Sequence, residues 1–273
     1  MAEPAKQFQV NRLSAAYWRV TFSNPPINLV DPDTVVELQG LVSLIEGAPE
    51  LRVVVFDSAD PDFFMARFDV ARAAGMPTTP GPSGLPPWTD ATRRLSLAPV
   101  VSIGLIRGRV RGGGAEIALA FDMRFASREK AIFGQPEVGA GLLPGGGAVE
   151  HLPQMMGRAR ALEVMLGSDD FDALTAERYG WINRALPDAE LDGFVDRLAR
   201  RIASFDREPL AEVKRLVNRD SLPSLDRLQE TQKAFFKALA WPGVARRGKR
   251  LRELGFGTRA PGELEMGRFL AEL

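Results

Sequence analysis

The stretch from residue 108 to 147 constrains the fold of this chain most, because it is dense in glycine and holds two runs of three. Gly112, Gly113 and Gly114 lie between an apolar run at 100–106, which has the length of a strand, and a short apolar helix at 115–121. Glycines at a helix start let a ligand approach unpaired backbone N–H groups, where the helix dipole adds positive partial charge. They also permit a tight turn or close packing without any ligand, and both interpretations stay open.

Two common phosphate-binding motifs are absent from this stretch. A G-x-G-x-x-G pattern that starts at Gly112 reaches Ile117 at its last position, and one that starts at Gly139 reaches Pro144. No Gly-Lys-Ser or Gly-Lys-Thr follows a four-residue spacer, which excludes a P-loop. The glycines therefore indicate neither a dinucleotide nor a nucleoside triphosphate site.

Two carboxylates lie close to these glycines. Glu116 occupies the first turn of the apolar helix, and Glu137 follows Pro136 before a second glycine-rich turn. The unpaired N–H groups at the helix start could stabilise a developing oxyanion. Two carboxylates beside them could divide the roles of general acid and general base. Each one taken alone is equally explained as a partner of a helix N-terminus or as a solvated side chain.

Composition narrows the chemistry further. The 35 Lys and Arg residues equal the 35 Asp and Glu residues, so the chain lacks the excess positive charge of proteins that bind nucleic acid or anionic membranes. It has no cysteine and one histidine, His151, which excludes thiolate catalysis, disulfides and the usual zinc sites. We expect no metal, and catalysis by carboxylates, backbone donors or Lys and Arg. No apolar stretch reaches 18 residues and no signal peptide opens the chain, so we expect a cytoplasmic protein without a membrane segment.

The order of expected elements indicates an α/β fold. Strands are predicted at 16–22, 52–57 and 100–106, and a helix capped by Asp31 with Pro32 at its first position lies between the first two. The proline-rich stretch 75–88 is predicted to be a loop within one domain. After residue 147 helices are predicted to dominate, at 158–166, 175–180, 188–205, 209–219 and 224–240. The apolar stripe of the helix at 224–240 covers either this chain's own sheet or a neighbouring subunit.

The segments GGGAEIALAFDMRFAS and FGQPEVGAGLLPGGG resemble the core signature of the crotonase, or enoyl-CoA hydratase/isomerase, superfamily. NPPINLVDPDTVVEL and RVVVFDSADPDFFMARFDV upstream, and GRARALEVMLGSDDFDALTAERYGWINRAL downstream, support the likeness. It covers roughly residues 10–220 in order and spacing. The resemblance implies the crotonase fold, a spiral of β-β-α turns, with a core domain at 1–200 and a C-terminal helical trimerisation region at 201–273. It also implies a homotrimer or a hexamer.

The resemblance further implies an acyl-CoA thioester substrate and no separate cofactor, because coenzyme A is part of the substrate. Backbone N–H groups of Phe68 and Gly113 would form the oxyanion hole, and Glu116 and Glu137 would be the catalytic residues. The flanking positions would bind substrate: Ala66, Arg67, Asp69, Gly112, Gly114, Pro136 and Leu142.

One segment departs from the family pattern. The first oxyanion segment of the family usually reads A-G-A-D or A-G-x-D, whereas this chain has Ala66-Arg67-Phe68-Asp69. A backbone N–H at Phe68 can still donate, since the donor does not depend on the side chain. Arg67 replaces an unconstrained glycine, and Phe68 adds an aromatic ring beside the reacting group. An unusual acyl pocket or altered donor geometry would follow.

These features favour an enoyl-CoA hydratase that adds water syn across the double bond of a 2-enoyl-CoA thioester. The alternatives are an enoyl-CoA Δ3-Δ2 isomerase that uses Glu137 alone, or another acyl-CoA enolate reaction, a hydrolase or a retro-aldol lyase. Some relatives bind RNA through a Lys-rich helix, which this chain lacks. His151 is either structural or part of a pocket wall. Arg67, Arg72, Lys130 and the basic cluster at 246–252 either contact CoA phosphates or are ordinary surface and packing charges.

Overall fold

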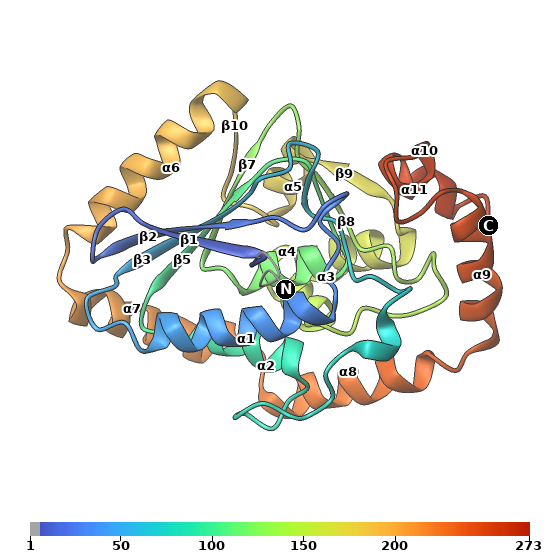
Figure 1. Cartoon of the computed structure of the whole chain (residues 1–273), viewed down its shortest axis with the longest axis horizontal. Helices are drawn as coiled ribbons and strands as arrows, with labels where there is room; N and C mark the ends of the chain where they lie inside the picture. The colour runs from blue at the N-terminus through green and yellow to red at the C-terminus, as the bar shows by residue number, and fades with distance from the viewer. Residues whose placement is uncertain (1–5) are drawn as a thin grey trace, which may run out of the picture.

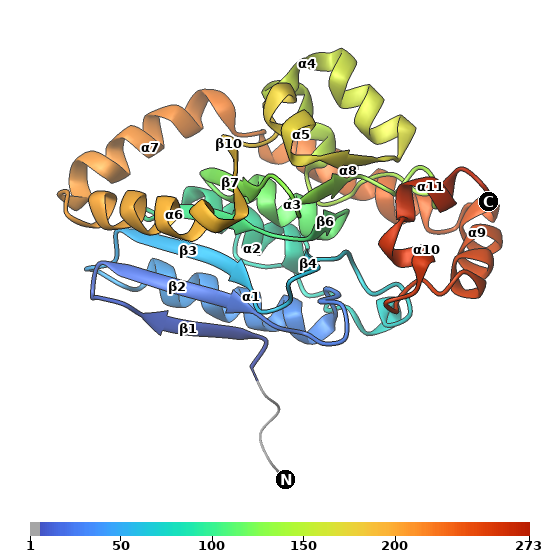
Figure 2. The same cartoon turned by 90° about the horizontal axis from the view of Figure 1, so that it is seen from above.

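The computed structural model describes residues 6–273, in which a large and a small sheet are surrounded by helices (Figures 1 and 2). The large sheet has six strands in the order β1-β2-β3-β5-β7-β10. Its β1 and β2 are antiparallel and the remaining neighbours are parallel. Its strands are β1 (Phe8–Arg12), β2 (Tyr17–Phe22), β3 (Val53–Ser58), β5 (Val101–Ile106), β7 (Met123–Ser127) and β10 (Arg184–Leu186).

The small sheet carries the segments that lead to the candidate site. It has four strands in the order β4-β6-β8-β9, and β4, β6 and β8 run parallel. The fourth strand pairs antiparallel with β8. These strands are β4 (Phe63–Met65), β6 (Arg109–Arg111), β8 (Ile132–Gly134) and β9 (Asp170–Asp172).

The two sheets and their helices repeat in a spiral. Each of three successive turns contains one strand of the large sheet, one short strand of the small sheet and one helix. The turns are β3-β4-α2, β5-β6-α3 and β7-β8-α4, with α2 at Pro87–Leu97, α3 at Gly113–Ala120 and α4 at Ala148–Gly167. This order confirms the predicted α/β class and the crotonase-type spiral of β-β-α turns.

Alternation of side chains along the central strands produces two apolar layers. Val53 and Val55 of β3 face the cluster covered by α6 (Asp188–Ala203), whereas Val54 and Phe56 face the main core on the side of α1 (Pro32–Glu46). A parallel strand buried on both faces reads as a continuous apolar run, which is what this segment of sequence shows. In Figure 1, α6 lies above the large sheet, and α1 and α2 lie below it.

The predicted cap of α1 is confirmed. Asp31 accepts a hydrogen bond from the Thr34 backbone N–H at 2.8 Å, and the Thr34 hydroxyl accepts one from the Asp31 N–H at 3.1 Å. This reciprocal capping satisfies N–H groups that a helix start leaves unpaired. Gln7 and Arg72 also donate to the Asp31 carboxylate, so the cap joins β1, α1 and the loop after β4.

Several boundaries differ from the predictions. The stretch 75–88 is largely loop, but the one-turn helix η1 (Ala73–Gly75) enters it and α2 already begins at Pro87, which suits the first turn of a helix. Helix α4 starts ten residues before the predicted 158, and its two parts meet at Gly157, where φ is 78°. The short strands β9 and β10 fall in the part that we expected to be dominated by helices.

From Asp188 onward the described chain is helical and wraps around the spiral. After α6 it continues through α7 (Arg207–Ser221), α8 (Leu225–Ala238), α9 (Pro242–Glu253), α10 (Pro261–Leu264) and α11 (Met266–Leu270). Helix α5 (Ala173–Tyr179) precedes this region. Helix α8 packs against α4 of its own chain through the buried Leu228, while Phe236 and Leu239 of its stripe stay exposed. The division at residue 200 and the trimerisation role of 201–273 remain predictions.

No helix in the described part of the chain has both the length and the apolar character that crossing a bilayer requires.

We expect Gly114→Ala to destabilise the fold, because a Cβ at this position would overlap the backbone carbonyl of Met65. Backbone cannot rotate away as a flexible side chain can, so we expect a loss of roughly 1–3 kcal/mol, the usual cost of overpacking. Gly40→Ala is the matched control, because Gly40 lies in α1 with nothing within 4 Å of its Cβ position. Alanine there should stabilise α1 by about 0.5–1 kcal/mol. Urea denaturation measures both, and equal stability of the two variants would contradict the close contact.

Candidate active site

Three loops leave the same edge of the small sheet. The residues after β4 are 66–69, those after β6 are 112–114, and those after β8 are 135–137. Because β4, β6 and β8 are parallel neighbours, their carboxyl ends lie side by side. The fold therefore brings together the segments that contain Phe68, Gly113 and Glu137, and Glu116 follows the second of them in the first turn of α3.

Backbone contacts hold these loops together. The Arg111 N–H donates to the Ala66 carbonyl at 3.2 Å, and the Gly112 N–H donates to the Gly134 carbonyl at 3.0 Å. Gly112 has a φ of 48°, a conformation that side chains with a Cβ rarely adopt. A Cβ there would also lie 2.6 Å from Glu137 Oε1. Close packing therefore requires glycine at Gly112 and Gly114. This requirement does not prevent a ligand from approaching the backbone N–H groups, so the ligand-binding and close-packing interpretations of the glycines are compatible.

The N–H groups of Gly113 and Phe68 are among those at these loops that have no acceptor within residues 6–273. Gly113 is the first residue of α3, so its N–H has no helical partner. The Arg67 carbonyl accepts from the Val30 N–H at 2.8 Å, and the Asp69 N–H donates to the Val30 carbonyl at 2.8 Å. Because a trans peptide points its N–H opposite to its carbonyl, the Phe68 N–H points away from Val30. These are the two donors that the sequence predicts.

The Phe68 side chain lies over Gly113. A Cβ on Gly113 would overlap the Phe68 ring, and this ring meets the Trp88 ring edge-on with centroids 4.8 Å apart. Trp88 in α2 is 6% exposed, and its Nε1 has no hydrogen-bond partner in the described chain. The sequence analysis missed Trp88, because it follows the proline-rich loop and no motif marks it.

Glu116 is buried in the first turn of α3, with 3% of its surface exposed. Its Oε1 accepts from the Gly146 N–H at 2.6 Å and from the Ala148 N–H at 3.4 Å. Burial raises its pKa to about 7, although these two hydrogen bonds to the charged form oppose that rise. A carboxyl group with a pKa near 7 can both accept and release a proton at neutral pH.

Glu137 follows β8 and belongs to the same electrostatic system. Its Oε2 is buried without a hydrogen-bond partner among residues 6–273. Burial raises the pKa of Glu137 well above its usual value, and the charge of Glu116 raises it further. The Cβ position of Gly112, the residue directly before α3, lies 2.6 Å from Glu137 Oε1, and Glu116 is in the first turn of α3, so the fold brings the two glutamates to the same end of this helix.

A third buried carboxylate, Glu150, was missed by the sequence analysis. It is 2% exposed, accepts a hydrogen bond from the Thr231 hydroxyl of α8, and its charge raises the pKa of Glu116. Burial raises its own pKa as well. The signal was available, because Glu150 stands near the start of α4 just after the second glycine run, as Glu116 does after the first.

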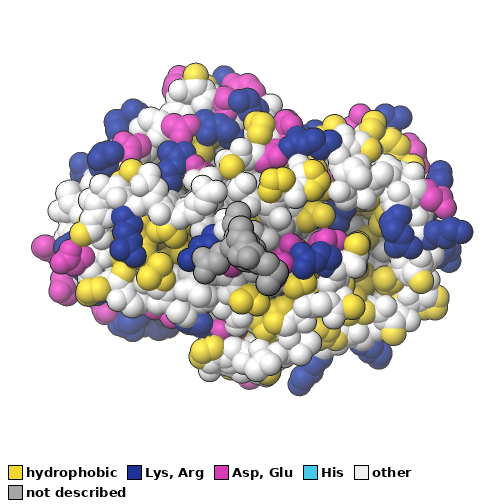
Figure 3. Space-filling model, in the orientation of Figure 1, with side chains coloured by type: hydrophobic (Ala, Val, Ile, Leu, Met, Phe, Trp, Pro, Cys, Tyr) yellow, Lys and Arg dark blue, Asp and Glu magenta, His cyan; other side chains and the backbone are white. Residues whose placement is uncertain are grey.

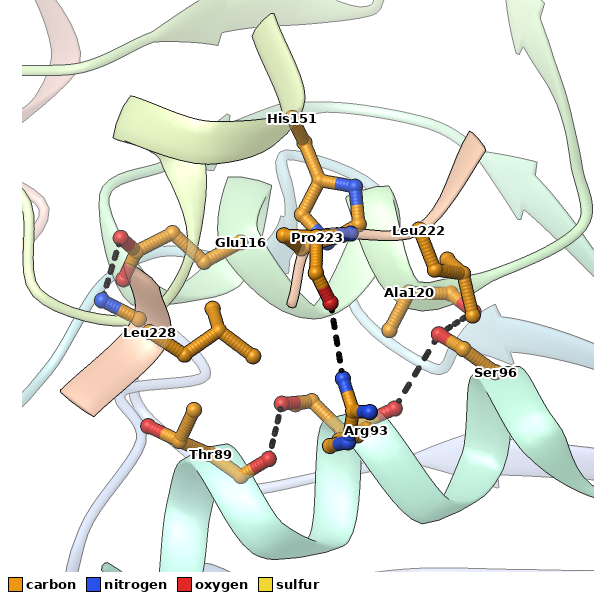
Figure 4. A pocket seen from close by; sticks show the side chains of 11 residues that line it. Thr89, Arg93, Ser96, Glu116, Ala120, His151, Leu222, Pro223 and Leu228 are labelled. Carbon is orange, nitrogen blue, oxygen red and sulfur yellow. Dashed lines mark hydrogen bonds between the residues drawn. The ribbon is translucent and has the colours of Figure 1, made fainter. Parts of the chain in front are cut away.

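A cavity of about 20 Å³ lies beside Glu116 (Figure 4), room for about one water molecule. His151 of α4 forms part of its wall, and burial lowers the pKa of His151 to about 4, which keeps the ring neutral. His151 therefore lines a cavity, and a role in the wall of a substrate pocket stays a prediction. The other walls come from α2, α3, α8 and the segment before α8, including Thr89, Thr92, Ser96, Leu222, Pro223 and Leu228.

Helix α8 closes the site from the side of the second glycine run. The Gln232 amide donates to the Gly145 carbonyl and to Thr89 Oγ1, the latter at 2.7 Å. A Cβ on Gly145 would lie 2.5 Å from Phe235 Cγ. The apolar stripe of α8 is thus divided between the site of its own chain and solvent-exposed residues.

The remaining predicted substrate-binding residues surround the same loops. Ala66 and Pro136 are buried, while Asp69 and Leu142 are partly exposed. The Pro136 carbonyl accepts from the Ala140 N–H, and the Leu142 N–H donates to the Glu137 carbonyl at 2.8 Å. No described contact tests whether these residues meet a substrate.

Three of the suggested phosphate contacts are engaged elsewhere in the protein. Arg67 pairs with Glu263 of α10, Arg72 with Asp31 and Asp33, and Lys130 with Asp188. The basic cluster lies on α9, at the right-hand edge of the face in Figure 3. Within residues 6–273 no group of three His, Cys, Asp or Glu side chains is arranged to hold a metal ion.

We expect the stability of the protein to fall as pH rises from about 4.5 to 7 because of Glu116. The unfolded chain releases this proton near the usual value of 4.5, whereas the folded state holds it up to about 7, so rising pH favours unfolding. Glu116→Gln should therefore gain stability relative to the wild type across this range, by roughly 1–3 kcal/mol. Thermal unfolding at pH 5 and pH 8 measures the difference. Glu190→Gln, at an exposed position of α6, is the control. A gain that is equal at both pH values would contradict this burial effect.

Comparison with known proteins places this chain in one family. The enoyl-CoA hydratase/isomerase family model matches residues 12–243. The chain is 30% identical over 208 residues to the short-chain-enoyl-CoA hydratase of Clostridium acetobutylicum, which is 76% of this chain and 79% of that protein. It is 26% identical over 219 residues to the crotonyl-CoA hydratase of Syntrophomonas wolfei, which is 80% of this chain and 84% of that protein.

A solved structure agrees over the whole chain. A Streptomyces avermitilis protein, provisionally described as an enoyl-CoA hydratase, is 43% identical and superposes with a TM-score of 0.93. The match covers 100% of this chain and 99% of that one. This chain is therefore an enzyme of the enoyl-CoA hydratase/isomerase family, within the crotonase superfamily.

Proposed function

We propose that this enzyme adds water syn across the double bond of a 2-enoyl-CoA thioester. The observation that carries the proposal is the buried carboxyl group of Glu116 and the partly exposed Glu137, whose Oε2 is buried, beside two backbone N–H groups without acceptors. The hydratase names of the Clostridium and Syntrophomonas relatives support the same reaction. The substrate brings its own coenzyme A, so the reaction requires no further cofactor.

The Phe68 and Gly113 N–H groups would bind the thioester oxygen. Attack of water at C3 moves electrons toward this oxygen, and the negative charge that develops there is stabilised by donors already in place. One such donor contributes roughly 3 kcal/mol to transition-state stabilisation in known enzymes. The position of Gly113 at the start of α3 adds the positive end of the helix dipole.

The two glutamates would manage the protons of the water molecule. Glu116, with a pKa of about 7, is partly ionised at neutral pH and would orient the water and accept its proton. Glu137, whose pKa is raised well above its usual value by burial and by the charge of Glu116, would hold a proton and deliver it to C2. Neighbouring acids whose surroundings separate their pKa values can provide one base and one acid at the same pH.

The other residues of the loops would complete the binding site. Backbone and small side chains at Ala66, Gly112 and Gly114 would leave room for the thioester, and Pro136 and Leu142 would border the acyl group. Asp69 would lie at the mouth of the site, and Arg67 would act from behind the oxyanion loop. We further propose a cytoplasmic homotrimer or hexamer that assembles through the region at 201–273.

The products formed from 2-enoyl-CoA and 3-enoyl-CoA thioesters test the reaction. We expect the 2-enoyl substrate to gain the mass of one water, as measured by mass spectrometry. A shifted double bond in the 3-enoyl substrate without a change in mass would instead identify an isomerase. Release of free coenzyme A would indicate hydrolysis, and cleavage of a carbon–carbon bond would indicate a lyase. Absence of reaction with every thioester would reject the proposal.

Neutralising either glutamate should abolish most of the turnover. We expect Glu116→Gln and Glu137→Gln each to lower kcat by roughly 10²- to 10⁴-fold, because each removes one proton-transfer group. Binding of a saturated acyl-CoA, measured by calorimetry, should change little. Asp57→Asn is the matched control, because it makes the corresponding amide substitution at a buried carboxylate that pairs with Arg19 on β2 and lies outside the proposed machinery. Near-wild-type turnover in both catalytic variants would reject the assignment.

A further inference from the structure

The short helix α10 lies behind both N–H donors of the proposed oxyanion hole. Arg67, which directly precedes Phe68, pairs with the Glu263 carboxylate through two contacts, at 2.6 and 3.2 Å. Arg111, two residues before Gly113, donates to the backbone carbonyls of Glu263 and Leu264 at 2.8 and 3.2 Å. Two consecutive residues of α10 therefore contact both donor loops.

The contact between Glu263 and Arg67 is buried and fully paired. The Glu263 side chain is 0% exposed and the Arg67 side chain 11%. Glu263 Oε2 also accepts from the Gly257 N–H at 2.7 Å, so both carboxylate oxygens have donors. A buried ion pair adds little net stability to a fold, but removal of one partner leaves the other charge buried without compensation, which is strongly unfavourable. The geometry of the pair is therefore held firmly.

Arg67 uses its remaining nitrogen on the oxyanion loop itself. Its Nη1 donates to the Phe68 carbonyl at 3.0 Å, while the Arg67 carbonyl accepts from the Val30 N–H. The carbonyls on both sides of Phe68 are thus fixed by hydrogen bonds, which leaves the Phe68 N–H little freedom to rotate. A guanidinium has enough donors in one plane to bind a carboxylate and a carbonyl together, which an ammonium group does less well.

We propose that Glu263 is a positioning residue, which acts through Arg67 to hold the Phe68 N–H in line with the thioester oxygen. This inference rests on the proposed function and adds to it a residue 195 positions away in sequence from the donor that it orients. It also gives a physical role to the arginine that stands where the family pattern has glycine. Arg111 supports the second donor loop in parallel, since it binds α10 carbonyls and the Asp170 carboxylate.

The proposal is tested with Glu263→Gln, Arg67→Met, the double variant, and Arg67→Lys. Arg67→Lys keeps a positive charge beside Glu263, but its ammonium group is less able to bind Glu263 and the Phe68 carbonyl at the same time. This variant therefore separates the loss of positioning from the loss of a charge partner for Glu263. Arg259→Met is the matched control, because Arg259 ties the same C-terminal segment to Asp60 and Asp62 without contacting either donor loop. Thermal unfolding of every variant is measured alongside activity.

Two readouts report on the donor. The first is the separation of kcat from KM with a 2-enoyl-CoA substrate. The second is the absorbance red shift of a bound cinnamoyl-CoA, which grows as hydrogen bonds polarise the conjugated thioester carbonyl and needs no turnover.

We expect Glu263→Gln and Arg67→Lys to lower kcat by roughly 10- to 100-fold, as small misalignments of reacting groups do, with KM within about threefold. The red shift should shrink in both variants. The double variant should be little worse than Arg67→Met, because the two residues act through one path. Arg259→Met should keep the kcat and the red shift of the wild type.

The outcomes separate this inference from the proposed function. Unchanged kcat and red shift in Glu263→Gln and Arg67→Lys would overturn the positioning role, even if both variants unfold at lower temperature. A wild type that shows the red shift without hydrating 2-enoyl-CoA would reject the hydratase activity while the variants still test positioning. No red shift in the wild type would overturn the oxyanion role of Phe68 and Gly113, and this inference with it.

Discussion

The contact between the first turn of α3 and the end of β4 determines most of what this protein can do. The backbone at Gly114 lies so close to the Met65 carbonyl that no side chain fits between them. This contact places the N-terminus of α3 directly beside the loop after β4, so that the backbones of two spiral turns meet there. The parallel pairing of β4, β6 and β8 then adds the loop of Glu137. The site is thus a product of backbone packing, and its side chains are placed by it.

The electrostatics follow from the same packing. Glu116 and Glu137 lie where the spiral turns meet, and burial of Glu116 and of the Oε2 atom of Glu137 makes both groups resist ionisation, while the charge of Glu116 raises the pKa of Glu137 further. Backbone N–H groups at Gly146 and Ala148 offset part of this cost for Glu116. The two carboxyl groups therefore lie in different surroundings although they share one site.

The sequence predicted those parts that depend on local pattern or on motif. The strands at the centre of the large sheet, the cap at Asp31 and the spiral all follow from short-range signals or from the family resemblance. The strands β4, β6 and β9 have three residues each, which is too few to show the alternation of a strand. No signal in the sequence indicates that α4 continues through the kink at Gly157. Glu263 could not be found from the sequence, because its partner Arg67 lies 196 residues away and only the fold brings them together. Trp88 is placed at the site in the same way, whereas Glu150 follows the second glycine run as Glu116 follows the first, a signal that the sequence offers.

The position of Trp88 has a consequence for how the site can be observed. Its ring stacks edge-on against Phe68, and a Cβ on Gly146, whose N–H binds Glu116, would lie 3.1 Å from its indole nitrogen. Trp18 and Trp181 are buried in the main core, and Trp241 is exposed before α9. Indole emission responds to nearby charge and to the polarity of its surroundings, so Trp88 makes the site its own optical sensor. We therefore expect the emission of Trp88 to change, without any added label, when Glu116 loses its proton or when a ligand enters the site.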